Sequence, residues 1–385
     1  MKLEGIRVLD LSQFLPGPHL TMMMADHGAE VIKIEPPGGE PVRQVGLRQN
    51  GHSVWFRNTH RNKRCMALNL KRQEAVQVVL RLARDADVFV EAFRPGVMQR
   101  LGLGYEALRA VNPRIVYCSI SAYGQTGPNS QKPAHDLSIQ AESGLVSVNL
   151  GADGAPAMPG LPAADMAGSL MALSAILMAL LRRASTGNGD YIDLSMQDAL
   201  LAWTPNVMGP VFAEQRAPVV KEERSWGGAA FYGIYATADG RHLTLGGSEI
   251  KFAENLLAAL GRSDLLDDCR QPPGPAQDAV REFLRTAFAS RTLMQWQTFL
   301  TPLDVCWAPV NTLHEALHTE HVRARGMRPE LPAGQPHLGI PIRFADEPGR
   351  LDARLEELGE STDAVLAELG YDLPAIAALR AAGAL

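Results

Sequence analysis

Cysteine and excess positive charge are both scarce in this sequence. Its 385 residues include only four cysteines, and no two of them form a CxxC pair: Cys65, Cys118, Cys269 and Cys306. Such spacing argues against a zinc site and a disulfide scaffold, and it fits a reducing compartment. The 37 basic residues do not exceed the 42 acidic ones, so the chain lacks the basic excess that nucleic-acid binding needs.

Long apolar runs are also scarce. The first residues, MKLEGIRVLDLSQ, lack the apolar stretch of a secretory signal peptide. The one long uncharged run covers the sixteen residues 166–181, slightly too few for a membrane span, and Asp165 and Arg182 bracket it. Its many small residues favour a helix packed in the core or against a second subunit. We therefore expect a cytoplasmic protein with no membrane partner.

Motifs for common nucleotide cofactors are missing. Residues 12–20, after the first expected strand, read SQFLPGPHL and not GxGxxG. GxxxxGK[ST] does not occur. NAD, FAD and P-loop chemistry are thus unsupported, and we predict no metal and no tightly bound cofactor.

β-rich and helical segments alternate in the first third of the chain. Strands are expected at 6–12, 30–37, 65–70, 87–93 and 115–121, a turn at 16–18, and helices at 20–28, 73–86 and 105–111. This alternation predicts an α/β fold whose parallel sheet has right-handed crossovers. Further along we expect a helix at 166–183 and a hairpin at 231–249. Residues 225–330 are predicted to form a smaller domain.

Three ionisable positions are candidates for chemistry, and each also has an ordinary explanation. Asp165 precedes the apolar helix, where free N–H groups stabilise an anion, although most such aspartates only cap a helix. His135, beside Asp136 in a Gly/Pro-framed loop, suits a general base or a simple packing role. Glu249 follows two glycines, which let a ligand approach, but it also suits a helix start.

Basic residues gather in HRNKR at 60–64, and Arg94 follows in FRPG. Such cations hold the phosphates of a small ligand in some proteins, while a solvated charged face is the usual explanation. With an acidic net charge, a phosphorylated metabolite is a better candidate ligand than a nucleic acid.

Sequence blocks along the whole chain resemble family III CoA-transferases (CaiB/BaiF) and the related α-methylacyl-CoA racemases. The matching blocks include LEGIRVLDLSQFLPGPHLTMMMADHGAEVIKIEPPGGEP at the start, EAFRPGVMQRLGLGYEALRAVNPRIVYCSISAYGQTGP at 91–128, PAHDLSIQAESGL at 133–145, STGNGDYIDLSMQDA at 185–199 and LGESTDAVLAELGY at 358–371. The ADMAGS block at 164–169 carries Asp165.

The resemblance implies a fold and a ligand. Family members have a large Rossmann-like domain built from both chain ends, here 1–224 and 331–385, and a smaller central α+β domain, here 225–330. Two subunits interlock as a homodimer. Coenzyme A is expected as part of an acyl-CoA substrate. By motif position, its binding regions contain Arg61, Lys63, Arg64, Arg94, Ala134 and Asp136.

Two chemistries share this fold. In the transferases, the aspartate matching Asp165 attacks an acyl-CoA, forms a mixed anhydride and then an aspartyl thioester, and CoA passes to an acceptor acid. In the racemases, the same aspartate and the histidine matching His135 exchange the α-proton through an enolate, and the glutamate matching Glu249 partners the histidine.

The residues divide between these chemistries. His135 and Glu249 follow the racemase pattern, whereas Ser138 and Ile139 replace the Asn-Tyr usual there, and Pro162 is more typical of transferases. We favour α-epimerisation of a 2-methylacyl-CoA, with CoA transfer between carboxylic acids as the alternative. A non-catalytic CoA-binding paralogue is the third hypothesis.

Overall fold

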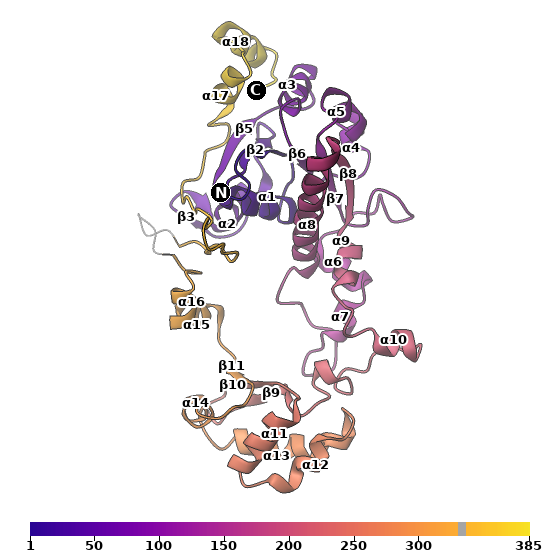
Figure 1. The fold of residues 1–385 in the computed structure, drawn as a ribbon, viewed down its shortest axis with the longest axis vertical. Coiled ribbons are helices and arrows are strands. Elements are labelled where there is room, and N and C mark those ends of the chain that lie inside the picture. Colours follow the sequence, from indigo (N-terminus) through magenta and orange to yellow (C-terminus); the bar gives the residue numbers. More distant parts are fainter. Residues whose placement is uncertain (330–335) are drawn as a thin grey trace. The chain divides into compact units, whose positions relative to one another are not determined.

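The computed structural model describes residues 1–329 and 336–385, and contacts within the chain divide it into two compact units (Figure 1). Unit 1 comprises Met1–Ser143, Pro159–Trp203 and Thr319–Leu385, and unit 2 comprises Gly144–Met158 and Thr204–His318. The domain limits 1–224, 225–330 and 331–385 stay predictions, and the limit between 330 and 331 falls outside the described residues.

A six-stranded parallel sheet forms the centre of unit 1. Its strands, in spatial order, are β5 (Lys63–Ala67), β2 (Glu30–Glu35), β1 (Arg7–Asp10), β6 (Val88–Glu91), β7 (Val116–Ser121) and β8 (Asp190–Ser195). Chain order reverses between β1 and β6. At such a switch point neighbouring loops leave the carboxyl ends of the strands in opposite directions and open a crevice, where ligands of open α/β sheets bind.

One face of this sheet packs against α1 (Pro16–Asp26) and α8 (Ala163–Thr186). The two helices contact each other, and His19 of α1 bonds Ser169 of α8 with 2.9 Å between Nδ1 and Oγ. Helices α6 (Asp136–Glu142) and α9 (Met196–Ala202) pack against α8. The start of α8 is thereby held by several elements of unit 1.

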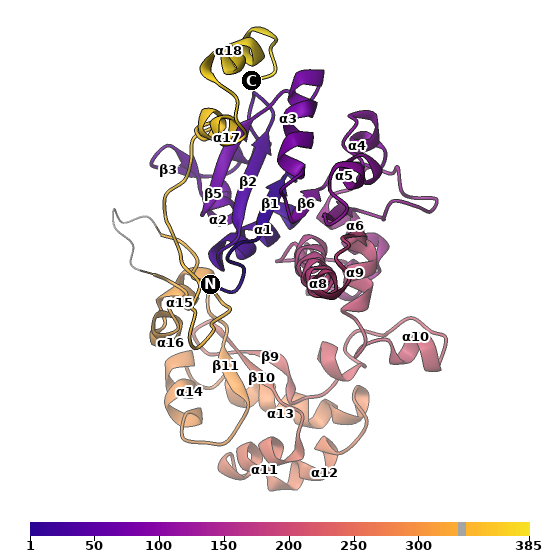
Figure 2. The same ribbon diagram turned by 45° about the horizontal axis from the view of Figure 1, so that its top comes forward.

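The opposite face carries the main apolar core, in which Leu9, Ile32, Met66, Phe89 and Tyr117 alternate with the residues of the first face. The helices that complete this core are α3 (Gln73–Ala83), α4 (Val97–Arg100), α5 (Tyr105–Val111), α17 (Thr362–Glu368) and α18 (Leu373–Ala381). Figure 2 shows the two C-terminal helices, in yellow, beside the β5 end of the sheet. The backbone N–H of Asn69 bonds the carbonyl of Ala384 at 2.9 Å, which joins the two chain ends in one core.

Shorter elements complete unit 1. They are the hairpin β3 (Arg48–Gln49) and β4 (His52–Ser53), helix α2 (Val54–His60) and helix α16 (Glu320–Ala324).

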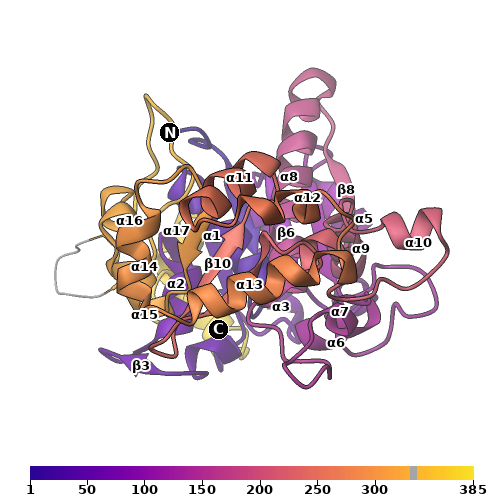
Figure 3. The ribbon, with the colours of Figure 1, turned by 90° about the horizontal axis from the view of Figure 1, so that it is seen from below.

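Unit 2 is built on an antiparallel sheet of β9 (Tyr232–Ala236), β10 (His242–Gly246) and β11 (Trp307–Pro309) (Figure 1). Its core comes from α11 (Ile250–Ala259), α13 (Asp278–Phe288) and α14 (Leu293–Leu300) (Figure 3), around the buried Trp296. The remaining helices are α7 (Leu145–Val148), α10 (Gly209–Ala213), α12 (Leu266–Cys269) and α15 (Leu313–His318). The predicted hairpin at 231–249 is β9 and β10, which pair antiparallel.

One local prediction is wrong. Residues 16–18 form the first turn of α1 and not a separate turn. Proline fits the first turn of a helix, because the N–H it lacks would have no partner there and its fixed φ is already helical. The other strands and helices predicted in the first third occur, with ends that differ by a few residues.

Among the described residues, α8 is the one helix long and apolar enough to span a membrane. This statement rests on its length and composition alone. Only 39% of its most apolar eighteen-residue window is buried. The exposed part carries large apolar side chains: Leu170, Met171, Leu177, Met178 and Leu181. This face of α8 therefore has no cover within the described chain.

The packing of α17 yields a test of the shared core. We expect Leu366→Ala to lower the free energy of unfolding by about 2–5 kcal/mol, because Leu366 is fully buried and the change leaves a cavity. Leu373→Ala, on the neighbouring α18, is the control: this side chain is 81% exposed, and we expect a change within about 0.5 kcal/mol. Urea unfolding followed by circular dichroism measures both, and equal effects would contradict the described packing.

Candidate active site at the start of helix α8

Asp165 is the third residue of α8, so its backbone N–H lies in the first turn, where helix N–H groups have no partner in the helix itself. The Asp136 carboxylate provides the missing hydrogen-bond acceptor. Its Oδ1 accepts the N–H of Ala164 at 2.8 Å and the N–H of Asp165 at 3.1 Å. Its Oδ2 accepts from the Gln140 side-chain amide at 2.6 Å. The cap of α8 is thus Asp136, and Asp165 is free for another role.

The Asp165 carboxyl group is partly buried and accepts no hydrogen bond from any residue that the structure describes. Burial raises its pKa to about 7, and the negative charge of Asp136 contributes to the increase. Both causes act in the same direction, because burial and the negative charge of Asp136 each disfavour the ionised form of Asp165. A carboxyl group with a pKa near neutrality exchanges protons readily at physiological pH.

His135 directly precedes α6, and its imidazole is exposed. Its ring lies edge-to-face with Phe14, with 5.6 Å between centroids and 80° between planes. Because Asp136 follows His135 and bonds the N–H of Asp165, the histidine and the aspartate belong to one local cluster. Ala134, one residue earlier, is half-buried in the same loop.

The loops that reach this cluster leave the carboxyl ends of neighbouring strands. Phe14 follows β1, Arg94 follows β6 and His135 follows β7. Arg94 is exposed, and no described residue pairs with its guanidinium group. The predicted phosphate role of Arg94 therefore suits its position, which is next to the switch point between β1 and β6.

Two of the predicted CoA-binding cations lie instead in the interior of unit 1. The Arg61 side chain is buried and pairs with Asp26 at 2.6 Å, and Lys63 is buried and pairs with Asp10 at 3.0 Å. Neither has a free donor directed at solvent, so we do not propose them as phosphate ligands. Sequence alone did not reveal this, because a buried ion pair requires a partner from a distant part of the chain.

Arg64 lies on the opposite sheet face from Lys63, as neighbouring strand residues do. It bonds Glu30 and Glu368 and lines a hollow, together with Arg350 and Arg354, near the amino ends of β2 and β5. This is the edge of the sheet away from the loops that carry Phe14, Arg94 and His135. The structure thus does not bring Arg64 together with Asp165.

Glu249 immediately precedes α11 in unit 2, where its side chain is exposed and makes no cap bond. Its predicted partnership with His135 stays a prediction. Among the described residues, no group of three or more His, Cys, Asp or Glu side chains is placed to hold a metal ion.

Two residues near the site had no signal in the sequence. His19 bonds Ser169, one turn beyond Asp165, and burial lowers its pKa to about 4, so this imidazole is neutral. Phe14 has a φ of 64°, which is rare for a residue other than glycine. Neither a backbone angle nor a long-range contact can be read from composition or spacing.

Comparison with known proteins decides the family. The family model described as CoA-transferase family III matches residues 3–362. The chain belongs to CoA-transferase family III. It is 35% identical to an acyl-CoA transferase of Fusarium pseudograminearum, over 97% of this chain and 86% of that one. It is 34% identical to the human alpha-methylacyl-CoA racemase, over 85% of this chain and 82% of that one. Like its relatives of both kinds, this family member is an enzyme.

A solved structure agrees with the fold. The CAIB/BAIF family protein from Brucella suis superposes with a TM-score of 0.82 at 31% identity, covering 95% of this chain and 99% of that chain. The mixed α/β architecture with its parallel sheet is therefore that of the CaiB/BaiF proteins.

The electrostatics of Asp165 predict a pH-dependent stability. Its folded-state pKa of about 7 exceeds the ordinary 3.8, so wild type loses stability as the pH rises between these values. Asp165→Asn removes the ionisation and keeps the size. We expect the variant to be more stable than wild type by about 1–3 kcal/mol above neutral pH, with little difference below about pH 4.

Thermal unfolding across this pH range measures the difference. Asp153→Asn, in an exposed loop of unit 2, is the control and should show no such pH dependence. A constant difference between Asp165→Asn and wild type at all pH values would contradict the raised pKa.

Proposed function

We propose that this enzyme acts on acyl-CoA thioesters and moves the α-proton of a 2-methylacyl-CoA, inverting that carbon. The observation that carries the proposal is Asp165, whose pKa of about 7 lets it accept and return a proton near neutral pH. An imidazole, His135, lies in the same cluster and provides a second acid–base group. Epimerisation needs two such groups, one for each face of the α-carbon.

In this mechanism one group removes the α-proton while the other donates a proton to the opposite face. The intermediate is an enolate of the thioester, whose charge is stabilised by hydrogen-bond donors around the carbonyl oxygen. Asp165 and His135 exchange roles when the opposite enantiomer reacts. Glu249 is proposed to orient the imidazole. Coenzyme A enters as part of the substrate, with Arg94 as a ligand of its phosphates.

CoA transfer between two carboxylic acids is the second candidate, favoured by a relative whose name is acyl-CoA transferase. Here the Asp165 carboxylate would attack the thioester carbonyl, release CoA as its thiolate and form a mixed anhydride. The thiolate would then attack the aspartyl carbonyl, expel the first acid as its carboxylate and leave CoA as an aspartyl thioester. This route requires an ionised Asp165 but no base at His135. A role for the imidazole therefore separates the two reactions.

The variants Asp165→Asn and His135→Ala test the choice. Asp165→Asn should abolish either activity, since the amide is neither a base nor a nucleophile. In an epimerase, His135→Ala should block inversion and still permit one enantiomer to exchange its α-proton through Asp165. In a transferase, the same variant should retain transfer within about tenfold, a barrier change of about 1.4 kcal/mol.

Deuterium incorporation from solvent into each enantiomer of 2-methylacyl-CoA is the measurement, run beside hydroxylamine trapping of an acyl-aspartyl intermediate. Glu249→Gln should follow His135→Ala if the glutamate orients the histidine. The epimerase proposal fails if wild type exchanges no α-proton yet transfers CoA between acids.

We also propose that the exposed apolar face of α8 is covered by a second copy of the chain, in an interlocked homodimer. Leu177, Met178 and Leu181 are 40%, 65% and 77% exposed in the single chain, and they lie at helical spacing on one face. An unpaired face of this kind is costly in water and typical of a subunit interface.

Met178→Glu should disrupt this association, because a carboxylate would be buried in an apolar interface. Leu373→Glu is the control, since that exposed leucine lies on α18. Sedimentation equilibrium at micromolar concentration measures the state. A folded, active wild-type monomer would overturn the dimer proposal.

A further inference from the structure

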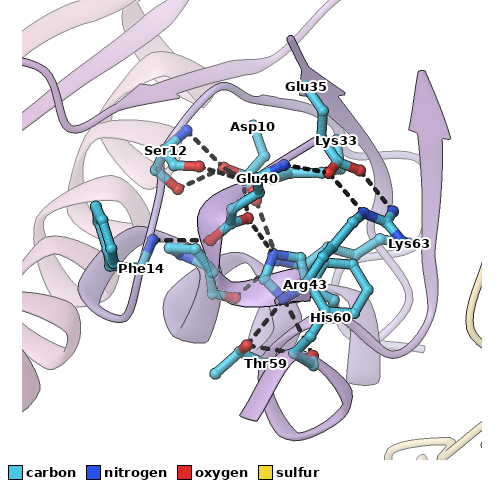
Figure 4. Close-up of polar contacts among 12 residues, drawn as sticks. Asp10, Ser12, Phe14, Lys33, Glu35, Glu40, Arg43, Thr59, His60 and Lys63 are labelled. Carbon is cyan, nitrogen blue, oxygen red and sulfur yellow. Dashed lines mark hydrogen bonds and ion pairs between the residues drawn. The ribbon is translucent and has the colours of Figure 1, made fainter. Parts of the chain in front are cut away.

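A closed network of buried charges lies where β1 and β2 end (Figure 4). Asp10, Lys33, Glu40, His60 and Lys63 are each at most 4% exposed. Lys63 pairs with Asp10 at 3.0 Å, and Lys33 pairs with Glu40 at 3.1 Å. The His60 imidazole bonds Glu40 Oε2 at 2.7 Å. With two lysines opposite two carboxylates, the charges balance, and a satisfied buried network of this kind is rigid.

This network holds the loop that follows β1. The N–H of Ser12 bonds Asp10 Oδ1 at 2.9 Å, and Lys33 donates to the carbonyl of Ser12. The N–H of Phe14 bonds Glu40 Oε1 at 2.8 Å. The loop is thereby fixed at Ser12 and at Phe14 by buried groups that cannot exchange their partners for water.

Phe14 has an unfavourable backbone conformation within this loop. Its φ of 64° is left-handed, which costs a residue with a side chain about 1–2 kcal/mol. Such strain persists only where surrounding contacts enforce it. The hydrogen bond to Glu40 is the contact that does so. Burial opposes ionisation of this carboxylate, but the charge of Lys33 and the hydrogen bonds from Lys33 and His60 outweigh it and lower its pKa to about 2.

The strained turn has one visible consequence at the candidate site. It places the Phe14 ring edge-to-face with the imidazole of His135, at a centroid distance of 5.6 Å. Among the described residues, this is the one ring, hydrogen-bond or ion-pair contact found for the His135 side chain. An exposed histidine without it would sample its staggered rotamers freely.

We propose that Phe14 is a positioning residue for His135: the buried network forces the left-handed turn, and the turned ring holds the imidazole in one orientation toward the substrate. This inference rests on the acid–base role proposed for His135. Phe14 itself takes no part in proton transfer. An aromatic ring is needed because its flat edge and face restrict the neighbouring ring more than an aliphatic side chain does.

The chain offers a matched control for this contact. Phe344 and His27 make a similar edge-to-face pair, with 5.4 Å between centroids and 85° between planes. Neither residue belongs to the candidate site. Phe344→Leu therefore removes the same kind of ring contact from a histidine without a proposed catalytic role.

The first measurement is independent of activity. Protein labelled with ¹³C at histidine Cε1 gives separate signals for its histidines, and His135→Gln and His27→Gln assign two of them. Loss of a ring current moves the signal of the histidine that packed against it. We expect Phe14→Leu to move the His135 signal and to leave that of His27, and Phe344→Leu to do the reverse. An unmoved His135 signal in Phe14→Leu overturns the inference.

The second measurement follows α-proton exchange in the two enantiomers of 2-methylacyl-CoA. We expect Phe14→Leu to slow the exchange that depends on His135 by about tenfold or more, and the exchange that depends on Asp165 by less than about twofold. Phe14→Tyr should restore the rate, because it keeps the ring. An equal decrease in both enantiomers, or no decrease, would show a structural role only and overturn the inference.

The two measurements separate the two possible failures. If wild type exchanges no α-proton while Phe14→Leu still moves the His135 signal, the proposed epimerisation is wrong and the catalytic purpose of the positioning falls with it, although the contact exists. If exchange occurs and the signal does not move, the epimerisation stands and the role of Phe14 is refuted.

Discussion

The carboxylate of Asp136 is the interaction on which the candidate site depends. It accepts the first free N–H groups of α8, and so it joins the loop after β7 to the start of the helix that carries Asp165. The same anion raises the pKa of Asp165. One side chain therefore caps the helix that carries the Asp165 carboxyl group and raises the pKa of that group, because the helix N-terminus and a nearby carboxyl group both respond to a negative charge.

Unit 1 contains several buried charged residues, and their ion pairs hold elements near the candidate site together. The pair of Arg61 and Asp26 connects α1 to the segment between α2 and β5, and the pair of Lys63 and Asp10 connects β5 to β1. Removing ions from water is costly, and each pair is tolerated because additional hydrogen bonds satisfy it. The arrangement holds the loop after β1 at the switch point of the sheet. Arg61 and Lys63, which belong to a basic cluster in the sequence, thus stabilise the interior of unit 1.

The two chemistries of the family use one geometry in different protonation states. A protonated or proton-exchanging Asp165 suits epimerisation, whereas attack on a thioester needs the ionised form. A pKa of about 7 leaves both forms populated at neutral pH. The second acid–base group that we propose at His135 would therefore distinguish the two reactions.

The sequence by itself determined the parallel α/β core, the hairpin of unit 2 and the family, and it predicted Asp165 as a candidate catalytic residue. Alternation of short apolar strands with amphipathic helices is a local pattern, and the family's blocks are continuous stretches of chain. Asp136 as the cap of α8, the burial of Arg61 and Lys63, and the contact of Phe14 with His135 were decided only by the tertiary structure. Each of these depends on atoms far apart in the chain: Asp136 reaches a helix that begins 27 residues later, and Phe14 is separated from His135 by 121 positions. Local spacing carries no information about such pairs, because their partners meet only when the sheet has formed and the loops at its carboxyl edge have come together.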